Sequence, residues 1–308
     1  MSKLITVFGA TGTQGGSVIR TIIADPKLSN EFRVRAVTRD PSKPNAKALA
    51  EQGIELIQGD MSSPADVAKA VDGAHTVYLV TNFWDTMSAK PEILQGKIVT
   101  DACNKAGVKH LIFSSLINAA KATEGRLVNI THFDGKAEVE EYIRESGIPA
   151  SFVMPGIFMT EIFSFIRKQE DGSFILATPV SPRTVAPWID AGIDTGNFVR
   201  AALQHPPLDN ANIIYAASDY YSFEQVAADF KSVIGEPLSV VTISSEMFKA
   251  GLAVSLPPDM VEEIYENLVL LEDPGYYAGA DLTSSLELLS EKPVSLKEFF
   301  EKNRGHWE

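Results

Sequence analysis

The chain has 308 residues, a single cysteine and a formal net charge of −13. This length allows one large α/β unit with a smaller lobe. The negative net charge argues against direct binding to nucleic acid, which needs a basic surface. The start lacks a secretory apolar core and no apolar run is long enough to span a bilayer, so we expect no membrane contact. We expect a soluble, cytoplasmic protein, with the nucleus left open as a second location, and no metal site.

The most informative segment lies at the start of the chain. An apolar, β-branched run from Leu4 to Phe8 ends at a glycine, two further glycines follow at three-residue intervals, and an amphipathic run opens at Ser17. This order indicates a strand, a tight turn and a helix N-terminus, where backbone N–H groups and the helix dipole favour a pyrophosphate. A plain structural turn is the alternative, but the flanking strand and helix favour a dinucleotide site. Its predicted residues are Gly9, Ala10, Thr11, Gly12, Thr13, Gln14 and Gly15.

Strands and helices then alternate as far as residue 154. Strands are expected at 32–38, 54–60, 74–80, 108–115 and 150–154, and helices at 46–52, 64–71, 92–106 and 132–146. Such alternation is typical of βαβ crossovers and a parallel sheet. It predicts an α/β fold, a Rossmann-type doubly wound parallel sheet, with residues 1–155 as the cofactor-binding domain. Cys103, inside one of these helices, is expected to fill the core.

The regular alternation ends at Pro155. Short strands are expected at 173–177, 185–189 and 213–217, and helices at 195–204, 223–234, 259–271 and 295–303. No linker rich in Gly, Ser or Pro separates the halves. We therefore expect residues 156–308 to form a smaller C-terminal α/β lobe over the cofactor, with segments around 185–220 returning to pack on the sheet.

The end of the second strand indicates the cofactor. NAD-binding proteins usually carry an acidic residue there, whereas an arginine accommodates the 2′-phosphate of NADP. Here Thr38 holds that position, and Arg39 and Lys43 place positive charge beside it. Asp40 could pair with Arg39 or with a ribose hydroxyl, and a solvated turn is the alternative to a binding site. The pattern predicts NADP(H) as the cofactor.

Two further strand ends contribute candidate residues. Asp60 follows the third strand, where its carboxylate could accept a hydrogen bond from an adenine amino group or cap the next helix. Thr81, Asn82 and Phe83 end the fourth strand, where they would face the pyrophosphate and ribose.

Several motifs together carry a family resemblance. The glycine spacing G-x-x-G-x-x-G, the run from His132 to Lys136 and the segment Thr81 to Trp84 resemble the NmrA-like family of atypical short-chain dehydrogenase/reductases. The resemblance covers residues 4 to 160 and is loose beyond them. It implies NADP(H) binding, with cofactor contacts also at Met61, at Lys136 and at a loop after the sixth strand. That loop comprises Gly156, Ile157, Phe158 and Met159, and its residues depart from the family's redox-sensing members.

The resemblance also indicates what the chain lacks. Dehydrogenases of this superfamily use a tyrosine four residues before a lysine, with a serine from the fifth strand. Lys136 stands in the lysine's place, but His132 holds the tyrosine's position, and Ser114 and Ser115 end the fifth strand. Lys136 is expected to contact the nicotinamide ribose, and its removal is expected to leave the stability of the cofactor-free protein unchanged.

Two function classes remain open. The missing tyrosine and the resemblance favour a redox sensor that acts through cofactor-dependent contacts with a regulatory protein partner, with a homodimer as an open alternative. The second class is an NADPH-dependent reductase of a small quinone, enone or carbonyl substrate. In that case Lys136 or His132 would manage the proton, and Ser115 would orient a carbonyl. A histidine that only packs or caps the helix is the alternative to a catalytic one.

Overall fold

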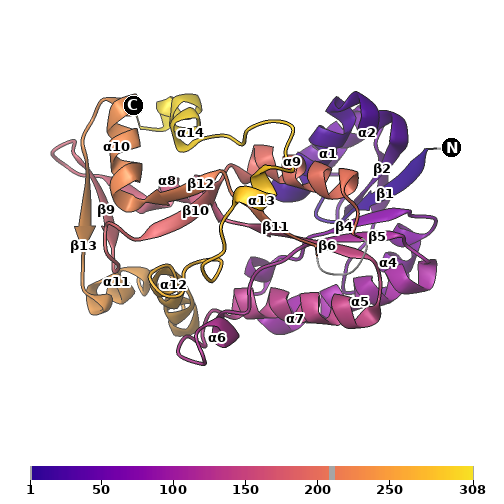
Figure 1. Cartoon of the computed structure of the whole chain (residues 1–308), viewed down its shortest axis with the longest axis horizontal. Helices are drawn as coiled ribbons and strands as arrows, with labels where there is room; N and C mark the ends of the chain where they lie inside the picture. Colours follow the sequence, from indigo (N-terminus) through magenta and orange to yellow (C-terminus); the bar gives the residue numbers. More distant parts are fainter. Residues whose placement is uncertain (1, 208–211, 308) are drawn as a thin grey trace.

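A seven-stranded parallel sheet forms the centre of the computed structural model, which describes residues 2–207 and 212–307 (Figure 1). Its strands follow the order β11-β6-β5-β4-β1-β2-β3. Successive strands are added outward on one side from β1 to β3 and on the other side from β4 onward, so the strand order reverses between β1 and β4. Ligands bind at such a switch point, outside the carboxyl ends of the strands. The strands are β11 (Asn212–Ala216), β6 (Ala150–Pro155), β5 (His110–Ser114), β4 (Thr76–Leu79), β1 (Lys3–Val7), β2 (Phe32–Thr38) and β3 (Glu55–Gln58).

Helices cover both faces of the sheet, as the doubly wound prediction requires. Every residue of β4, β5 and β6 is buried, which is typical of parallel strands covered on both sides. One face carries α1 (Thr13–Ala24), α2 (Pro26–Glu31) and α9 (Ala191–Gln204), and the other carries α4 (Pro64–Val71), α5 (Ala89–Ala106) and α7 (Thr131–Ser146) (Figure 1). Helix α3 (Pro44–Glu51) lies on the face of α1, because its Leu49 belongs to the same core cluster. The predicted fold class is confirmed.

The segment after residue 185 returns to this sheet through α9 and β11. Strand β11 pairs with β6, and α9 packs closely on α1. The close approach depends on Gly196, because a Cβ there would lie 2.5 Å from the backbone oxygen of Ser17. Ser17 also fixes the contact, since its hydroxyl donates to Ile193 O at 2.8 Å and accepts from Gly196 N at 2.9 Å.

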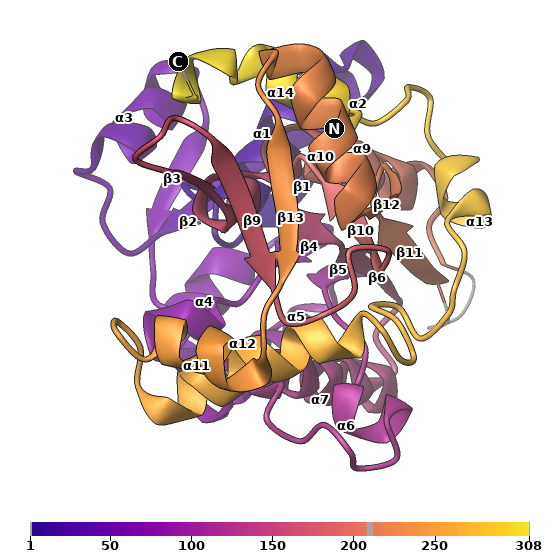
Figure 2. The same cartoon turned by 90° about the vertical axis from the view of Figure 1, so that its left-hand side faces the viewer.

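The C-terminal lobe contains two three-stranded sheets that the sequence predicted only in part. The first consists of β12 (Asp219–Ser222), β10 (Val185–Ile189) and β7 (Ile157–Phe158), and the second of β13 (Leu238–Thr242), β9 (Phe174–Thr178) and β8 (Ile166–Lys168). Its helices are α8 (Ile162–Phe165), α10 (Phe223–Ile234), α11 (Ser245–Leu252), α12 (Pro258–Leu270), α13 (Thr283–Leu286) and α14 (Leu296–Lys302). Figure 2 shows β9 and β13 in front of the lobe, with α11 and α12 below them.

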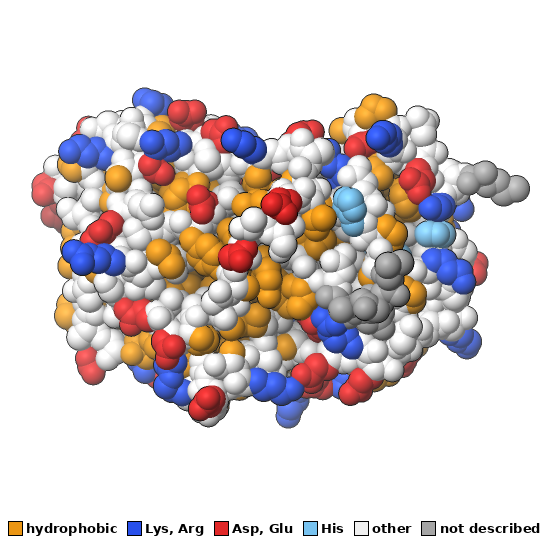
Figure 3. Space-filling model, in the orientation of Figure 1, with side chains coloured by type: hydrophobic (Ala, Val, Ile, Leu, Met, Phe, Trp, Pro, Cys, Tyr) orange, Lys and Arg blue, Asp and Glu red, His pale blue; other side chains and the backbone are white. Residues whose placement is uncertain are grey.

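Several short elements complete the chain. They are α6 (Ala119–Ala122) and the 3₁₀ turns η1 (Phe83–Asp85), η2 (Met159–Glu161) and η3 (Arg304–His306). On the face drawn in Figure 3, hydrophobic side chains gather in the middle and charged ones dominate the margin. Cys103 is fully buried, and burial raises the pKa of its thiol to about 12, which fits the expected core role. Within residues 2–207 and 212–307, no helix is both long and apolar enough to cross a membrane.

Candidate functional site

A cavity of about 1090 Å³ opens at the carboxyl ends of the sheet strands and extends under the C-terminal lobe. Most of the predicted site residues line it, although they come from segments far apart in the sequence. They are Gly9, Thr11, Gly12, Thr13, Gln14, Gly15, Arg39, Lys43, Asp60, Met61, Thr81, Asn82, Phe83, His132, Lys136, Gly156, Ile157 and Phe158.

Three predicted residues lie elsewhere. Ala10 is buried against α1, and Met159 is fully buried in the core of the C-terminal lobe. Ser115 is also fully buried, and its hydroxyl donates to Glu140 Oε2 at 2.6 Å. Ser115 therefore does not face a substrate, because the alternation of a strand turns its side chain away from the cavity that Ser114 lines.

The glycine loop forms the cradle that a dinucleotide phosphate requires. Gly9 has a φ of +65°, and a Cβ at Gly15 would lie 2.3 Å from Gly9 O, so side chains are excluded where strand and helix approach. Gly12 is the N-cap of α1 and offers no side-chain cap, which leaves the first N–H groups of the helix for a ligand. The helix begins at Thr13, four residues before the amphipathic run that suggested its start.

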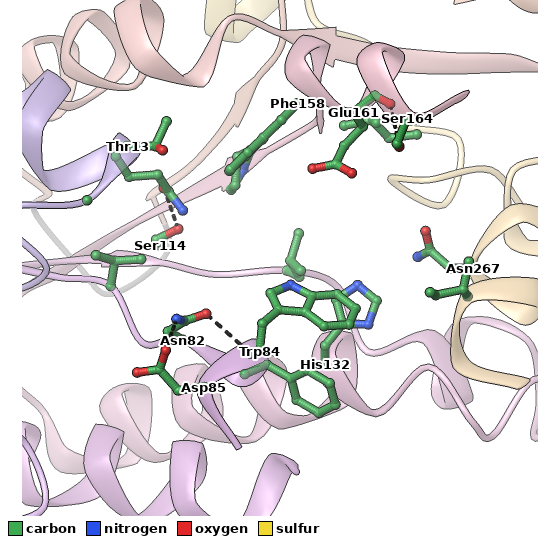
Figure 4. A pocket seen from close by; sticks show the side chains of 18 of the residues that line it. Thr13, Asn82, Trp84, Asp85, Ser114, His132, Phe158, Glu161, Ser164 and Asn267 are labelled. Atoms are coloured by element: carbon green, nitrogen blue, oxygen red, sulfur yellow. Dashed lines mark hydrogen bonds between the residues drawn. The ribbon is translucent and has the colours of Figure 1, made fainter. Parts of the chain in front are cut away.

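Gln14 is fixed beside this loop by two hydroxyl groups. Its Oε1 accepts hydrogen bonds from the Tyr78 phenol at 3.1 Å and from the Ser114 hydroxyl at 2.9 Å. Burial raises the pKa of Tyr78 well above its ordinary value, so the phenol stays protonated and remains a donor. The Tyr78 phenol and the Ser114 hydroxyl both donate to the amide oxygen of Gln14. The NH₂ group on the other side of the amide is therefore left to donate to other acceptors. Figure 4 shows Thr13 and Ser114 on this side of the cavity.

The basic residues at the end of β2 line the cavity, but their pairing differs from the expectation. Arg39 does not pair with Asp40; its guanidinium contacts Asp85 of η1 at 2.8 Å. Asp40 instead accepts hydrogen bonds from the backbone N–H and the hydroxyl of Ser42. These bonds lower the pKa of Asp40 below its ordinary value. Arg39 is 68% exposed, so its exposed guanidinium is accessible to a competing phosphate.

Asp60 lines the cavity and does not cap a helix. The N-cap of α4 is Ser63, whose hydroxyl accepts from Asp66 N, whereas Asp60 accepts from Ser62 N at 2.7 Å. Of the two roles left open for Asp60, the helix cap was therefore wrong. One oxygen of its carboxylate is used by the local turn, and the side chain still borders the cavity.

Lys136 borders the cavity as the centre of a buried polar cluster. Its ammonium donates to Thr81 O at 3.2 Å, to Thr81 Oγ1 at 3.0 Å and to Glu92 Oε1 at 2.5 Å. Glu92 is only 1% exposed, so the pair is a buried ion pair. An ammonium has three donors, and all three are used. A cofactor hydroxyl would have to replace one of these partners. Loss of Lys136 would also leave Glu92 unpaired, which argues against the nearly unchanged stability expected from the sequence.

His132 is held by a carboxylate from the C-terminal lobe. Glu263 of α12 accepts hydrogen bonds from His132 Nδ1, from His132 N at 2.9 Å and from both N and Oγ1 of Thr131. Burial tends to raise the pKa of Glu263, but the hydrogen bonds and the nearby imidazole outweigh it, so the pKa lies below the ordinary value. The ionised carboxylate accepts from Nδ1 and therefore keeps a proton on that ring nitrogen. His132 is thus positioned through a specific partner.

The other ring nitrogen of His132 is left for a ligand. Nε2 has no hydrogen-bond partner within residues 2–207 and 212–307, and the ring lines the cavity. Phe83, Trp84 and Phe133 surround the imidazole, with centroid separations of 5.8, 5.4 and 4.8 Å. These rings restrict the orientation of the histidine. Figure 4 shows Trp84 and His132 side by side in the cavity wall.

Three residues from other elements also contribute to the site, and the sequence did not predict them. Glu92 and Glu263 position Lys136 and His132, and Asn267 lines the cavity from α12. A signal for Glu263 was present, because it interrupts an apolar helical spacing between Met260 and Leu268. Its partner could not be identified, since 131 positions separate it from His132.

Comparisons with known proteins agree with this architecture. The model of the NmrA-like family matches residues 1–300. The NmrA-like family domain-containing oxidoreductase malD of Malbranchea aurantiaca is 34% identical over 262 residues, which are 79% of this chain and 76% of that protein. A similarly described oxidoreductase of Aspergillus flavus, lnaB, is 32% identical over 76% of this chain and 73% of its own length.

Solved structures show the same fold. The negative transcriptional regulator NmrA in complex with NADP has a TM-score of 0.82 at 24% identity, covering 98% of this chain and 95% of NmrA. Triphenylmethane reductase of Citrobacter sp., complexed with NADP(H), has a TM-score of 0.76 at 22% identity, covering 97% of this chain and 99% of the reductase. At these identities the likeness concerns the fold alone. The family match and the sequence relatives go further, and they confirm the predicted resemblance: this chain belongs to the NmrA-like family.

Proposed function

We propose that this protein is an NADP(H)-dependent oxidoreductase in which His132, oriented by Glu263, is the proton donor. The observation that carries the proposal is the buried carboxylate against Nδ1 of a histidine whose ring lines the cavity and whose Nε2 has no hydrogen-bond partner among the residues that the structure describes. A carboxylate that fixes the tautomer and orientation of an imidazole is the arrangement expected of an acid–base residue. The names of the curated relatives, which are oxidoreductases, support this choice.

The cavity residues fit the cofactor. The glycine cradle at the start of α1 would take the pyrophosphate, and Arg39 with Lys43 would take the 2′-phosphate. When bound, NADPH would supply the hydride for a substrate carbonyl carbon. His132, with a proton on both ring nitrogens, would give its Nε2 proton to the carbonyl oxygen, which receives the electron pair of the C=O bond. The ring would keep the Nδ1 proton beside Glu263 and regain the Nε2 proton from solvent.

NADPH oxidation by the purified protein tests this proposal. We expect consumption of NADPH with at least one member of a panel of quinones, enones and ketones, and much slower consumption of NADH. Background rates with the whole panel would contradict the proposal.

A redox sensor is the second candidate, and the Arg39–Asp85 ion pair favours it. A 2′-phosphate would compete with Asp85 for Arg39, and Asp85 belongs to the same short turn as Trp84, which is 49% exposed. Cofactor binding would then alter an exposed aromatic segment that a regulatory protein or a second copy of the chain contacts.

Sedimentation of the protein with NADPH, NADP⁺ or neither, repeated with Asp85→Asn, tests the homodimer. A mass unchanged by cofactor would contradict a sensor that acts by dimerisation. Pull-down with and without NADPH tests the partner.

A further inference from the structure

The cavity extends beyond the predicted cofactor residues into an apolar annex of the C-terminal lobe. The annex walls come from α8, β9, α11 and α12, and they include Phe165, Leu176, Phe248, Leu252, Ile264 and Leu268. Two charged residues, Glu161 and Arg167, also line this part of the cavity, and both are exposed to solvent. Ligand sites are typically apolar with few polar groups that fix orientation. The annex has this composition.

One polar side chain in the annex lacks a partner. Asn267 lines the cavity from α12, and its amide is turned toward the space opposite Trp84 and His132 (Figure 4). Its Nδ2 is shielded from water and has no hydrogen-bond partner in the part of the chain that the structure describes. A buried N–H group without a partner is unfavourable, so a donor retained at a cavity wall indicates an acceptor on a ligand.

The position of Asn267 relates it to the proposed proton donor. Asn267 follows Glu263 by four residues on α12, and Glu263 holds His132. Four residues of an α-helix rise by about 6 Å, so Asn267 stands about one helical turn from the residue that holds His132. Both His132 and Asn267 line the same cavity. A ligand with one acceptor at His132 could therefore extend a second acceptor toward Asn267.

We propose that the annex binds a largely apolar substrate with two hydrogen-bond acceptors, one at each end, and that Asn267 donates to the acceptor remote from the reacting carbonyl. Asn267 is thus a specificity-determining residue. The inference rests on the proposed function for the reacting end of the substrate. It concerns binding, however, and can be tested without turnover.

Equilibrium dialysis of the NADP⁺-loaded protein provides the test, because NADP⁺ cannot reduce the ligand. The matched probes are menadione, which carries two carbonyl oxygens, and 2-methylnaphthalene, which has a similar shape and none. We expect Asn267→Leu to weaken menadione binding roughly five- to tenfold, the effect of one hydrogen bond, and to leave 2-methylnaphthalene binding unchanged or tighter. Asn267→Asp, which keeps the shape but removes the donor, should weaken menadione binding as well.

Asn104→Leu, at an exposed position on α5 away from the cavity, is the control and should change neither Kd. Equal changes for both probes in Asn267→Leu, or no change for either, would overturn the role of Asn267. Failure of both probes to bind the unmodified protein would overturn the proposal that the annex is a substrate-binding site. If menadione binds and depends on Asn267 while no quinone is reduced by NADPH, the substrate site stands and the proposed function fails.

Discussion

Lys136 and His132, which stand in the places of the superfamily's lysine and tyrosine, are each held by a buried glutamate from another helix. Glu92 neutralises Lys136, and Glu263 orients His132. Both carboxylates are about 1% exposed, so each depends on the hydrogen bonds that its partner donates. Lys136 is therefore a structural residue as well as a candidate cofactor contact. His132 is held through Nδ1 only, and its Nε2 remains available to contact a substrate.

Replacement of Lys136 tests the structural role. Lys136→Met should lower the free energy of unfolding by about 3–5 kcal/mol, because Glu92 would be left buried and unpaired. Urea denaturation of the cofactor-free protein measures this change. The double variant Lys136→Met with Glu92→Gln should recover much of the loss, since no uncompensated charge remains. A single variant as stable as the unmodified protein would refute the buried ion pair.

Replacement of Arg39 tests the choice of cofactor. NADPH should bind more tightly than NADH by roughly 1–3 kcal/mol, the scale of a charge-assisted hydrogen bond, and Arg39→Ala should remove most of this difference. Calorimetric titration with each dinucleotide measures it. Arg33→Ala, which removes an exposed arginine of the same strand away from the cavity, is the matched control. Equal affinities for both dinucleotides in the unmodified protein would contradict the assignment.

At the scale of elements, the contact between α5 and α7 depends on a glycine. A Cβ at Gly96 would lie 2.4 and 2.5 Å from the two methyl groups of Val139. This close packing brings Glu92 on α5 within reach of Lys136 on α7. The geometry of the polar cluster is therefore set by helix packing, which no local sequence motif records.

Gly96→Ala should cost about 1–3 kcal/mol of stability, because the added methyl group overpacks this contact. Val139→Ala in the same chain should reverse most of the loss. Gly251→Ala is the control: Gly251 lies in α11 with nothing within 4 Å of its Cβ position, so alanine there should stabilise by about 0.5–1 kcal/mol. Thermal unfolding of the four proteins checks these values, and a fully stable Gly96→Ala would contradict the packing argument.

The sequence predicted the elements with strong periodicity and missed the shortest ones, and it also missed α2, β12, β13 and α11. Strand 32–38 and helices 64–71 and 223–234 were predicted with their observed bounds. Strand β7 has two residues and β8 has three, too few for an alternating pattern to be recognised. Helix α1 was started too late, because Gly15 and Gly16 were attributed to the turn although both lie in the helix. The sequence predicted site residues that belong to local motifs, such as Lys136 and His132. It did not predict Glu92 and Glu263, the buried residues that pair with them.

At the scale of the whole molecule, the end of the chain returns from the C-terminal lobe to α9. Asp194 on α9 accepts a hydrogen bond from Val294 N at 2.9 Å, and Arg200 contacts Glu291 at 3.4 Å. The segment between α13 and α14 thereby joins the sheet half to the C-terminal lobe (Figure 1). Burial raises the pKa of Asp194 to about 6, despite its hydrogen bonds.

The raised pKa of Asp194 predicts a stability that falls with rising pH. Between the ordinary value of 3.8 and about 6 the unfolded chain loses this proton while the folded chain retains it. Above pH 6 the folded state must ionise a buried carboxyl, at a cost of about 3 kcal/mol. Asp194→Asn should therefore gain stability relative to the unmodified protein between pH 4 and pH 7, measured by urea denaturation. A difference between the two proteins that is constant with pH would refute the shift.

The central claim is that His132, oriented by Glu263 of the C-terminal lobe, supplies the proton in the cofactor cavity. The kcat for NADPH oxidation by His132→Gln, with the best substrate of the panel and NADPH at saturation, tests it most directly. We predict a fall of about 10²- to 10⁴-fold, the usual contribution of a general acid, with the Kd for NADPH within twofold of the unmodified protein. A kcat that is unchanged in His132→Gln would contradict the claim.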